Sequence, residues 1–446
     1  MAGDFFELDR GESTGNGKET KMEAYSVKTI DKPITGTVVV PGSKSMTNRA
    51  LLLAALSKES AILRGVLFSD DSRHFLQCLV DLGFELDINE EEKKVRIQGT
   101  GGNIPKKTAA IYVGSAGTAA RFITAMLALS DGEYTIECSK QMEKRPMAEL
   151  FRVLSSMGAE FTYLNEKEHL PVKVKGNGGN CKDIQMDISK STQFLSAMLM
   201  VTPVTKSGIK IQITSEKKTG SYIHITENML KGFGVEVSFD GEIYEVKGNQ
   251  ELHIGDYYIE PDVSAACYFY GMAALTQGRV KVKNVHANSM QGDMKFLDLL
   301  VQMGCEKTEE ADGIIIQGPK MEKLQGVDVD MNDFSDQALT LAALAPFANT
   351  PTVIRNIGHI RGQECNRMAA IVTELSKCGI DCREEGDDIY IYPGQVQPAK
   401  IETYDDHRVA MAFSLLGLRA EGIEILDPLC CRKTFENYFE VLENLV

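Results

Sequence analysis

The stretch PGSKSMTNRALLLAAL, residues 41–56, decides the fold of this chain. The β-branched run Thr37–Val40, just before this stretch, is typical of a strand. The Ala- and Leu-rich part of the stretch itself is typical of a buried helix. Ser43, Lys44 and Ser45 are therefore expected on the first helical turn, where unpaired backbone N–H groups attract anions. The stretch predicts a strand followed by a helix whose N-terminus binds a small anion.

This stretch has two other interpretations. A Walker A loop reads GxxxxGK[ST], but here a strand fills the segment from Gly36 to Gly42, and Ser43 separates Gly42 from Lys44. We therefore do not expect a nucleoside triphosphate to bind there. An ordinary serine-capped amphipathic helix would explain the stretch equally well if it stood alone.

The same kind of helix start recurs along the chain. In each of six copies a small or charged cluster opens an apolar helix, and successive copies are 73, 74, 72, 72 and 70 residues apart. So regular a spacing predicts six copies of one structural unit. The positions that define the spacing are Ser45, Thr118, Thr192, Ser264, Asp336 and Asp406.

Two glycines recur in the same phase as the helix starts. The first follows a helix, where a C-cap requires positive φ, and the second follows an apolar strand that closes a hairpin-like pair. The unit is therefore β-α-β-α-β-β, and the sixth copy needs a strand from the N-terminus to complete it. The glycine pairs are Gly83 and Gly99, Gly158 and Gly176, Gly234 and Gly248, Gly304 and Gly318, and Gly379 and Gly394.

Composition narrows the class of protein. A chain of 446 residues is too long for one core and suggests two domains of about 200 residues each. A net charge of -15 argues against nucleic acid or an anionic membrane as partner. The ten cysteines contain no CxxC pair, which indicates reduced thiols rather than disulfides or a metal site. With no apolar span of 18 residues and no leader, we expect a cytoplasmic protein with a disordered extension at residues 1–22.

The six helix starts divide by charge. The first three carry hydroxyls, glycine and cations, and the last three carry carboxylates. If the N-termini converge, one face binds a phosphorylated small molecule while the other deprotonates its hydroxyl. The first set is Lys44, Ser45, Arg49, Gly117, Thr118, Arg121, Ser191, Thr192 and Gln193, and the second is Asp262, Asp336, Asp405 and Asp406.

Eight motifs, in this order and at these intervals, resemble one enzyme family: GSKSMTNRA, GSAGTAARF, EKRPMAEL, SKSTQFLSA, SMQGDMKF, RGQECNRM, YDDHRVAMAF and DPLCCRKTF. From about Tyr25 to the C-terminus, the chain is similar to the 5-enolpyruvylshikimate-3-phosphate synthase family. The resemblance implies an α/β fold with two domains, each built of three repeats arranged as an inside-out α/β barrel. It also implies a transferase of the shikimate pathway, in chorismate and aromatic amino-acid biosynthesis.

The reaction that the resemblance implies moves the enolpyruvyl group of phosphoenolpyruvate to the 5-hydroxyl of shikimate 3-phosphate. Phosphate leaves through a tetrahedral intermediate, and no metal or organic cofactor takes part. The catalytic residues would be Asp336 as general base, Glu364 as proton donor to the methylene carbon, and Lys44. Shikimate 3-phosphate would bind Lys44, Ser45, Arg49, Ser191, Thr192, Gln193, Thr219, Tyr222, Asp336, His359 and Gln363. Phosphoenolpyruvate would bind Lys44, Gly117, Thr118, Arg145, Gln193, Arg367, His407, Arg408 and Lys433.

Three positions depart from the family's pattern. Gln363 stands where a lysine commonly precedes the catalytic glutamate, and His359 replaces a frequent asparagine. Glutamine donates hydrogen bonds but supplies no charge. Phe122 stands where many relatives have proline, beside an unsubstituted Gly117 that predicts sensitivity to glyphosate, an inhibitor of the phosphoenolpyruvate site.

The resemblance and the repeat together predict the domain organisation. The first domain is expected at residues 43–261 and the second at 23–42 plus 262–446, with hinges just before Gly42 and near Pro261. The active site would lie in the interdomain cleft, which should be open without ligand and close on shikimate 3-phosphate. We expect a monomer whose partners are its two small-molecule substrates.

Three alternatives remain. A UDP-N-acetylglucosamine enolpyruvyl transferase typically reads GAKNA and carries a reactive cysteine five residues before the arginine of its RP motif, whereas Lys140 holds that position here and Cys138 lies seven before Arg145. A kinase-like protein would need a P-loop or a carboxylate cluster for metal. A non-catalytic repeat scaffold would not need the division of charge, although Asp336 and Asp406 alone could be plain helix caps.

Overall fold

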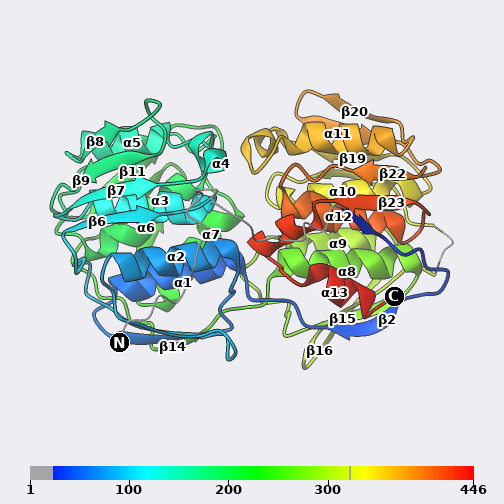
Figure 1. The fold of residues 1–446 in the computed structure, drawn as a ribbon, viewed down its shortest axis with the longest axis horizontal. Helices are drawn as coiled ribbons and strands as arrows, with labels where there is room; N and C mark the ends of the chain where they lie inside the picture. Colours follow the sequence, from blue (N-terminus) through cyan, green and yellow to red (C-terminus); the bar gives the residue numbers. More distant parts are fainter. Residues whose placement is uncertain (1–23, 321–322) are drawn as a thin grey trace, which may run out of the picture.

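The computed structural model describes residues 24–320 and 323–446, which form two α/β domains side by side (Figure 1). The expected disordered extension, residues 1–22, lies outside the described residues. None of the helices within residues 24–320 and 323–446 combines the length and the apolar character that a membrane span requires.

The first domain holds three units. The first contains α1 (Lys44–Leu56), β3 (Ser60–Arg64), α2 (Asp70–Asp81), β4 (Leu86–Asn89) and β5 (Lys94–Gln98). The second contains β6 (Thr108–Tyr112), α3 (Gly117–Ala128), β7 (Glu133–Glu137), α4 (Lys140–Glu143), α5 (Ala148–Ser156), β8 (Glu160–Tyr163) and β9 (Val172–Lys175). The third contains β10 (Ile184–Met186), α6 (Gln193–Val201), β11 (Ile209–Ile213), α7 (Ser221–Gly232), β12 (Val237–Phe239) and β13 (Ile243–Val246).

The second domain repeats this plan. Its first unit contains α8 (Val263–Thr276), β15 (Arg279–Lys283), α9 (Met294–Gln302), β16 (Glu306–Glu310) and β17 (Gly313–Gln317). The next contains β18 (Asp328–Asp330), α10 (Ala338–Leu344), β19 (Thr352–Arg355), α11 (Arg367–Lys377), β20 (Cys382–Glu385) and β21 (Asp388–Ile391). The last contains β22 (Ala399–Ile401), α12 (His407–Gly417), β23 (Ile423–Leu426) and α13 (Tyr438–Glu443).

The β-α-β-α-β-β unit is confirmed by the sheets. The orders β6-β7-β9-β8, β10-β11-β13-β12 and β18-β19-β21-β20 follow one pattern, in which the first two strands are parallel and the last two form an antiparallel hairpin. The five expected C-cap glycines all have positive φ, from 74° at Gly379 to 106° at Gly304. The sixth sheet, β1-β23-β22, is completed by β1 (Ala24–Ser26) from the N-terminal end of the described chain.

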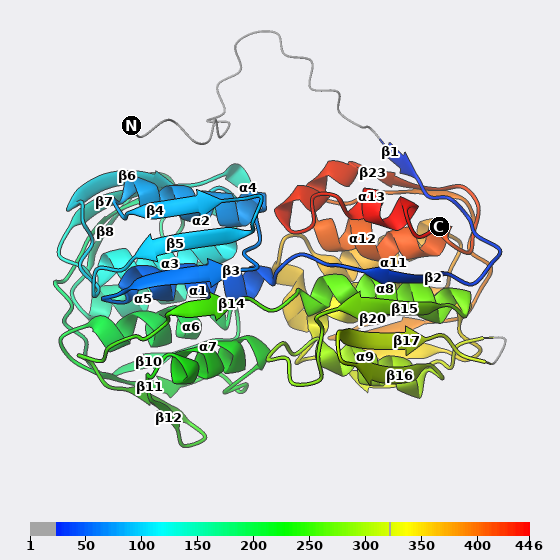
Figure 2. The same ribbon diagram turned by 90° about the horizontal axis from the view of Figure 1, so that it is seen from below.

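Two strands are exchanged between the domains. β2 (Thr35–Val38) precedes α1 but pairs in parallel with β15 of the second domain, whereas β14 (Asp256–Tyr258) precedes α8 but pairs in parallel with β3 of the first (Figure 2). The chain therefore crosses between domains twice, and the two crossings meet at a bridge between Gly42 and Pro261. The strand lies two residues earlier than the sequence predicted, because Val39 and Val40 already belong to the crossing.

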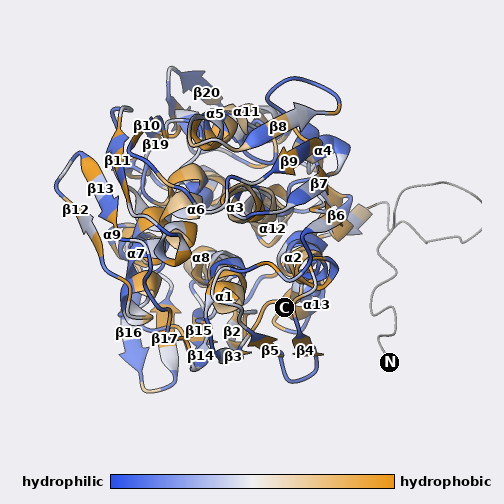
Figure 3. Ribbon diagram, turned by 90° about the vertical axis from the view of Figure 1, so that its left-hand side faces the viewer, coloured by the Kyte–Doolittle hydropathy of each residue, from blue (hydrophilic) through white to orange (hydrophobic). Residues whose placement is uncertain are grey.

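Each domain has its own hydrophobic core. One core draws on residues from Met46 to Ile259, and the other on residues from Tyr25 to Val40 and from Val263 to Leu442. The helices α1, α3 and α6 lie inside the first domain with strands around them, as the end-on view in Figure 3 shows. Their Ala-, Leu- and Met-rich sequences are apolar on every face, so they are stable only when surrounded by other elements.

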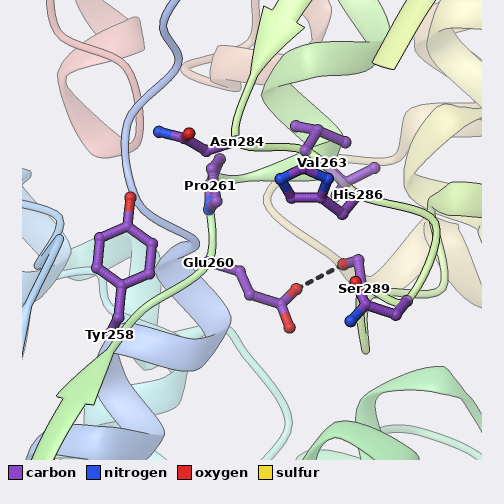
Figure 4. Close-up of a pocket in the computed structure, with 9 residues that line it drawn as sticks. Tyr258, Glu260, Pro261, Val263, Asn284, His286 and Ser289 are labelled. Carbon is purple, nitrogen blue, oxygen red and sulfur yellow. Dashed lines mark hydrogen bonds between the residues drawn. The ribbon is translucent and has the colours of Figure 1, made fainter. Parts of the chain in front are cut away.

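A small pocket of about 470 Å³ lies beside the crossing (Figure 4). The Glu260 carboxylate accepts hydrogen bonds there from the Ser289 hydroxyl at 2.5 Å and from the Gln291 side chain at 3.2 Å, and the Met290 N–H donates to it at 3.4 Å. These bonds tie the second crossing to the loop before α9. Because both carboxylate oxygens are already engaged, we assign this pocket no ligand.

Candidate active site

The starts of the six recurrent helices, α1, α3, α6, α8, α10 and α12, line one cleft of about 810 Å³ between the domains. Parallel helices place their unpaired N–H groups and positive dipole ends in this common space, which favours anions. The triplicated unit in each domain thus produces the convergence that the sequence predicted. The lining residues at the helix starts include Lys44, Ser45, Gly117, Thr118, Thr192, Gln193, Asp262, Ser264, Asp336 and Arg408.

Most of the expected site residues reach this cleft, and three do not. Thr219 contacts His224 Nε2 at 3.3 Å and does not line the cleft. His407 is fully buried behind the surface, and Lys433 pairs with Asp405 at 2.8 Å. The expected residues that do line the cleft are Lys44, Ser45, Arg49, Gly117, Thr118, Arg145, Ser191, Thr192, Gln193, Tyr222, Asp336, His359, Gln363, Glu364, Arg367 and Arg408.

Arg49 and Lys44, which the sequence predicted as substrate-binding cations of the first domain, also have partners within the protein. Arg49 is only 1% exposed, and its guanidinium donates to the Thr226 hydroxyl at 2.8 Å and to the Ser45 carbonyl at 2.9 Å. Most of its donors are therefore used inside the domain, where it fixes the start of α1. Lys44 forms an ion pair with Asp71 at 3.3 Å, a partner that no repeated motif indicated.

The second-domain face is organised by Arg367. This fully buried guanidinium forms ion pairs with Asp406 at 2.7 Å, Asp336 at 2.8 Å and Glu364 at 2.9 Å. Asp406 also caps α12 through the Arg408 N–H, so the plain-cap interpretation holds for Asp406 in part. Asp336 caps no helix, because it lies within the short 3-10 helix Ser335–Gln337.

The electrostatic surroundings keep both proposed catalytic carboxyls ionised. Burial raises the pKa of Asp336, but Arg408 at 3.1 Å and Arg367 outweigh it and hold that pKa below its usual range. Burial likewise raises the pKa of Glu364, and the charges of Arg367 and Arg145 hold it well below its usual range. At neutral pH both groups are carboxylates before substrate arrives.

Asp293 also lines the cleft, although the sequence predicted no role for it. It precedes α9 within the motif SMQGDMKF, and its carboxyl accepts a short hydrogen bond from the Ser264 hydroxyl. Burial first and the Asp336 charge second raise the pKa of Asp293 to about 7. The cleft therefore holds one carboxyl that is kept ionised, Asp336, and one whose protonation changes near neutral pH, Asp293.

The raised pKa of Asp293 predicts how the stability of the folded chain changes with pH. Its folded pKa of about 7 exceeds the ordinary value of 3.8, so its contribution to stability is fully present below pH 3.8 and is lost as pH rises through 7. Asp293→Asn should therefore gain stability relative to the parent chain as pH rises from 4 to 8, measured by urea unfolding. The control is Asp298→Asn, whose side chain is 63% exposed. A difference that does not change with pH would contradict the assignment.

Several buried polar atoms near the cleft have no partner within the described chain. They are Asn48 Oδ1, Arg121 Nε, Arg145 Nε and both ring nitrogens of His407. Burial and the nearby Lys44 charge lower the pKa of His407 well below its usual range, so its imidazole is neutral. Among residues 24–320 and 323–446, no group of His, Cys, Asp or Glu is arranged to hold a metal ion.

Several charged residues that line the cleft had no predicted role, among them Asp71, Asp293 and Lys217. Arg121 was among the cations predicted at the helix starts, and Asp293 lies in the motif SMQGDMKF. Arg121 donates to Gln193 Oε1 at 2.7 Å and fixes that amide. Lys217 lies in a connection that differs from copy to copy, where periodicity carries no signal, and Asp71 lies in the first turn of α2, away from the recurrent helix starts.

Comparison with known proteins agrees with the geometry. The family model described as EPSP synthase (3-phosphoshikimate 1-carboxyvinyltransferase) matches residues 28–442. A 3-phosphoshikimate 1-carboxyvinyltransferase of Trichormus variabilis is 42% identical over 419 residues, which cover 94% of this chain and 98% of that protein. One of Vibrio campbellii is 40% identical over 428 residues, with 95% and 100% covered.

Solved structures give the same result. EPSP synthase from Acinetobacter baumannii aligns with a TM-score of 0.79 at 26% identity, covering 94% of this chain and 97% of that one. The enolpyruvyl transferase NikO of Streptomyces tendae aligns with a TM-score of 0.74 at 16% identity, covering 95% and 97%, which is a likeness of fold alone.

Proposed function

The chain belongs to the EPSP synthase family, and from this premise we propose how its residues carry out the reaction. It is a 3-phosphoshikimate 1-carboxyvinyltransferase of chorismate and aromatic amino-acid biosynthesis. It transfers the enolpyruvyl group of phosphoenolpyruvate to the 5-hydroxyl of shikimate 3-phosphate and releases phosphate.

The observation that carries this function is the convergence of six helix starts on one cleft, with Lys44 and Arg145 on one side and Asp336 and Glu364 on the other. The test is phosphate release from phosphoenolpyruvate by the full chain. Release is expected only when shikimate 3-phosphate is present. Release without it, or none with it, would overturn the function.

Shikimate 3-phosphate is assigned to the hydroxyl-rich part of the cleft. Ser191, Thr192 and Gln193 at the start of α6 supply hydroxyl, amide and backbone donors for phosphate and ring. Tyr222 supports the acceptor from α7, and its hydroxyl donates to Asp336 Oδ2 in a short hydrogen bond. The 5-hydroxyl would then lie next to Asp336, its proposed base.

Phosphoenolpyruvate is assigned to the space between Lys44, Gly117, Arg145 and Arg408. Arg145 donates to the Ser115 carbonyl at 3.2 Å, and its Nε has no hydrogen-bond partner among the described residues. A guanidinium can bind phosphate or carboxylate with two parallel hydrogen bonds, whereas Lys44 adds a mobile point charge. The α3 start supplies backbone donors beside them.

Proton transfers follow from the two carboxylates. Asp336 takes the proton of the 5-hydroxyl as that oxygen bonds to C2 of phosphoenolpyruvate, and Glu364 gives a proton to the methylene carbon C3. Loss of phosphate from C2 and of a proton from C3 then restores the double bond. Because bound phosphoenolpyruvate engages the arginines, it weakens their hold on both carboxylates, which raises the pKa of Glu364 toward protonation and makes Asp336 more basic.

The alternative function, that of a UDP-N-acetylglucosamine enolpyruvyl transferase, would need a reactive cysteine, and Cys138 is the nearest candidate to the expected position. Burial raises the pKa of its thiol to about 12, so Cys138 is not a thiolate at neutral pH. It also does not line the cleft. No feature of the described chain favours that reaction over the proposed one.

Gly117→Ala should selectively impair the phosphoenolpyruvate site. A Cβ at Gly117 would lie 2.8 Å from Cζ, Nη1 and Nη2 of Arg145, so the guanidinium must move. We expect KM for phosphoenolpyruvate to rise about 10- to 100-fold, because a 1 Å misplacement has effects of that size. Glyphosate should inhibit the parent chain and inhibit this variant less.

The matched control for Gly117 is Gly232→Ala in α7, where a Cβ would meet nothing within 4 Å. It should keep the parent KM values. Full activity of the parent chain in millimolar glyphosate would contradict the prediction. Phe122 would then be the residue to examine: it is fully buried, and the Arg49 guanidinium carbon lies 5.2 Å from its ring centre.

Domain closure on the acceptor is a further expectation. In this structure the domains touch at separate points: Tyr222 with Asp336, Lys217 with Asn332 and Asp333, Arg73 with Glu436 at 3.5 Å, and Gln141, which donates to the Glu364 carbonyl at 3.4 Å and accepts from Lys433 at 3.2 Å. We expect the free chain to be more open, since few bonds join the domains. Small-angle scattering should show a smaller radius of gyration with shikimate 3-phosphate than with inorganic phosphate. Identical curves would contradict closure.

The domain boundaries are proposed on the strand exchange. Residues 43–261 would move as one body and residues 24–42 with 262–446 as the other, hinged at Gly42 and Pro261. We further propose a cytoplasmic monomer that binds no nucleic acid: all ten cysteines are free thiols, and the net charge is -15.

A further inference from the structure

Two cleft positions on the acceptor side lack the positive charge that binding a phosphorylated acceptor favours. Gln363 is a neutral amide, and its Oε1 accepts a short hydrogen bond from Arg367. Burial first and the Lys217 charge second lower the pKa of His359, so its imidazole is neutral at pH 7. Positive charge for a phosphorylated acceptor would then come from another lysine or arginine that lines the cleft.

Lys217 lies where that charge is needed. It belongs to the connection between β11 and α7, lines the cleft, and is 34% exposed. A Cβ placed at Gly220 would lie 3.5 Å from Lys217 Nζ and 3.9 Å from Thr192 Cγ2. The ammonium group and the hydroxyl-rich start of α6 thus flank the same point, and Gly220 leaves room for the lysine stem.

The backbone of Lys217 is hydrogen-bonded, through Ser215, to the segment that precedes α6. The Ser215 hydroxyl donates to the Lys217 carbonyl at 2.9 Å and accepts from the Ile188 N–H at 3.2 Å. Lys217 therefore keeps its place relative to the segment that leads into Ser191 and Thr192. This anchoring lowers the entropy cost of holding a long side chain at a ligand.

Across the cleft, Lys217 meets the second domain. Its ammonium donates to the Asn332 carbonyl at 3.2 Å, to Asn332 Oδ1 in a short bond, and lies 3.5 Å from Asp333 Oδ1. Asp333 has a second cation, Lys295, at 2.9 Å. Lys217 can therefore turn one donor to a phosphate without leaving Asp333 unpaired.

We propose that Lys217 is a substrate-binding residue for the acceptor: its ammonium group binds the phosphate of shikimate 3-phosphate and supplies the charge that Gln363 lacks. This assignment rests on the proposed function. It also makes Lys217 a bridge, since one side chain contacts the acceptor from the first domain and Asn332 and Asp333 from the second.

The test compares Lys217→Gln with Lys218→Gln. Lys218 carries the same charge on the next residue, but its ammonium donates to the Ile213 carbonyl at 2.7 Å and does not line the cleft. Lys217→Gln should raise KM for shikimate 3-phosphate about 10- to 100-fold, the size expected for one charge-assisted hydrogen bond, with KM for phosphoenolpyruvate within about threefold. Lys218→Gln should change neither.

Binding of unphosphorylated shikimate separates a phosphate contact from a mere interdomain contact. Measured by calorimetry, Lys217→Gln should weaken the affinity for shikimate 3-phosphate but change the affinity for shikimate by less than about twofold. Lys217→Arg should retain both affinities. Asp333→Asn should leave the ratio of the two affinities unchanged. Equal weakening of both ligands, or an Asp333→Asn variant that reproduces Lys217→Gln, would overturn the proposal.

Restoring charge at position 363 tests the second half of the proposal. Gln363→Lys in the Lys217→Gln background should recover at least about tenfold in affinity for shikimate 3-phosphate, and no recovery would overturn the claim that Lys217 replaces that charge. Failure of the proposed function looks different, because the parent chain itself would then release no phosphate with both substrates present.

Discussion

Replacing Asp336 with asparagine is expected to lower kcat by about 10³-fold, within the 10²- to 10⁴-fold range of general acid–base catalysis. Asparagine keeps the shape of the side chain and can still accept the hydrogen bond that the Tyr222 hydroxyl gives to Asp336. Its neutral amide cannot take the proton of the 5-hydroxyl. Because the lost interaction is with the reacting proton, KM for both substrates should change by less than about fivefold.

Steady-state phosphate release with both substrates saturating measures this effect. The control is Asp328→Asn, a carboxylate of the same unit that is 56% exposed and pairs with Arg355 at 2.5 Å. It should retain the parent kcat. A thermal unfolding midpoint close to that of the parent shows that Asp336→Asn is folded. If the variant keeps more than about a tenth of the parent kcat, Asp336 is not the base.

Arg367→Met should lower the free energy of unfolding by about 3–5 kcal/mol, the range found when one member of a buried ion pair is removed. Methionine fills similar volume but leaves Asp406, Asp336 and Glu364 without their shared cation. Asp406 is fully buried, so its charge cannot be solvated. The loss is measured by urea unfolding at pH 7.

Arg383→Met is the matched control for this experiment. Arg383 pairs with Glu385 at 3.0 Å, but its side chain is 54% exposed, and an exposed pair contributes about 0–1 kcal/mol. Asp406→Asn in the Arg367→Met background should recover part of the loss, because one unpaired charge disappears. Equal effects of Arg367→Met and Arg383→Met would show that the carboxylate cluster tolerates the absence of its cation.

The two substitutions address different properties of one cluster. Arg367 holds three carboxylates together in the absence of substrate. One of the three, the Asp336 carboxylate, acts as the base in the reaction. An ion-pair cluster of this kind places the base correctly, but it also lowers its basicity. Substrate anions that compete for Arg367 and Arg408 offer a physical means of raising basicity only when the reactants are present.

The sequence predicted the fold because the fold is repeated. Six apolar helix starts at a spacing near 72 residues each require the same strand and hairpin around them, and any helix as apolar as α1 must be enclosed. The repeated C-cap glycines were equally readable, since only glycine adopts positive φ there without strain. The same periodicity placed Lys44, Gly117, Thr192 and Asp336 at helix starts.

Side chains outside the repeat were not readable in this way. Lys217 lies in a loop whose sequence differs from copy to copy, and Asp71 lies in the first turn of α2, which no repeated motif marks. Arg49 and Arg367 were expected to point their donors at substrate, yet both are 1% exposed and bond mainly within their own domains. Sequence spacing indicates which face of a helix carries a residue, but not which neighbouring groups compete for its donors.

The sequence by itself determined the six-fold unit, the two-domain class, the family and the helix ends that carry the chemistry, because these depend on local periodicity and on residue type. The tertiary structure alone decided the exchange of β2 and β14, the enclosure of Arg367 by three carboxylates and the reach of Lys217 across the cleft. Those features arise where segments distant in sequence meet, and the energies that set them depend on distance and burial.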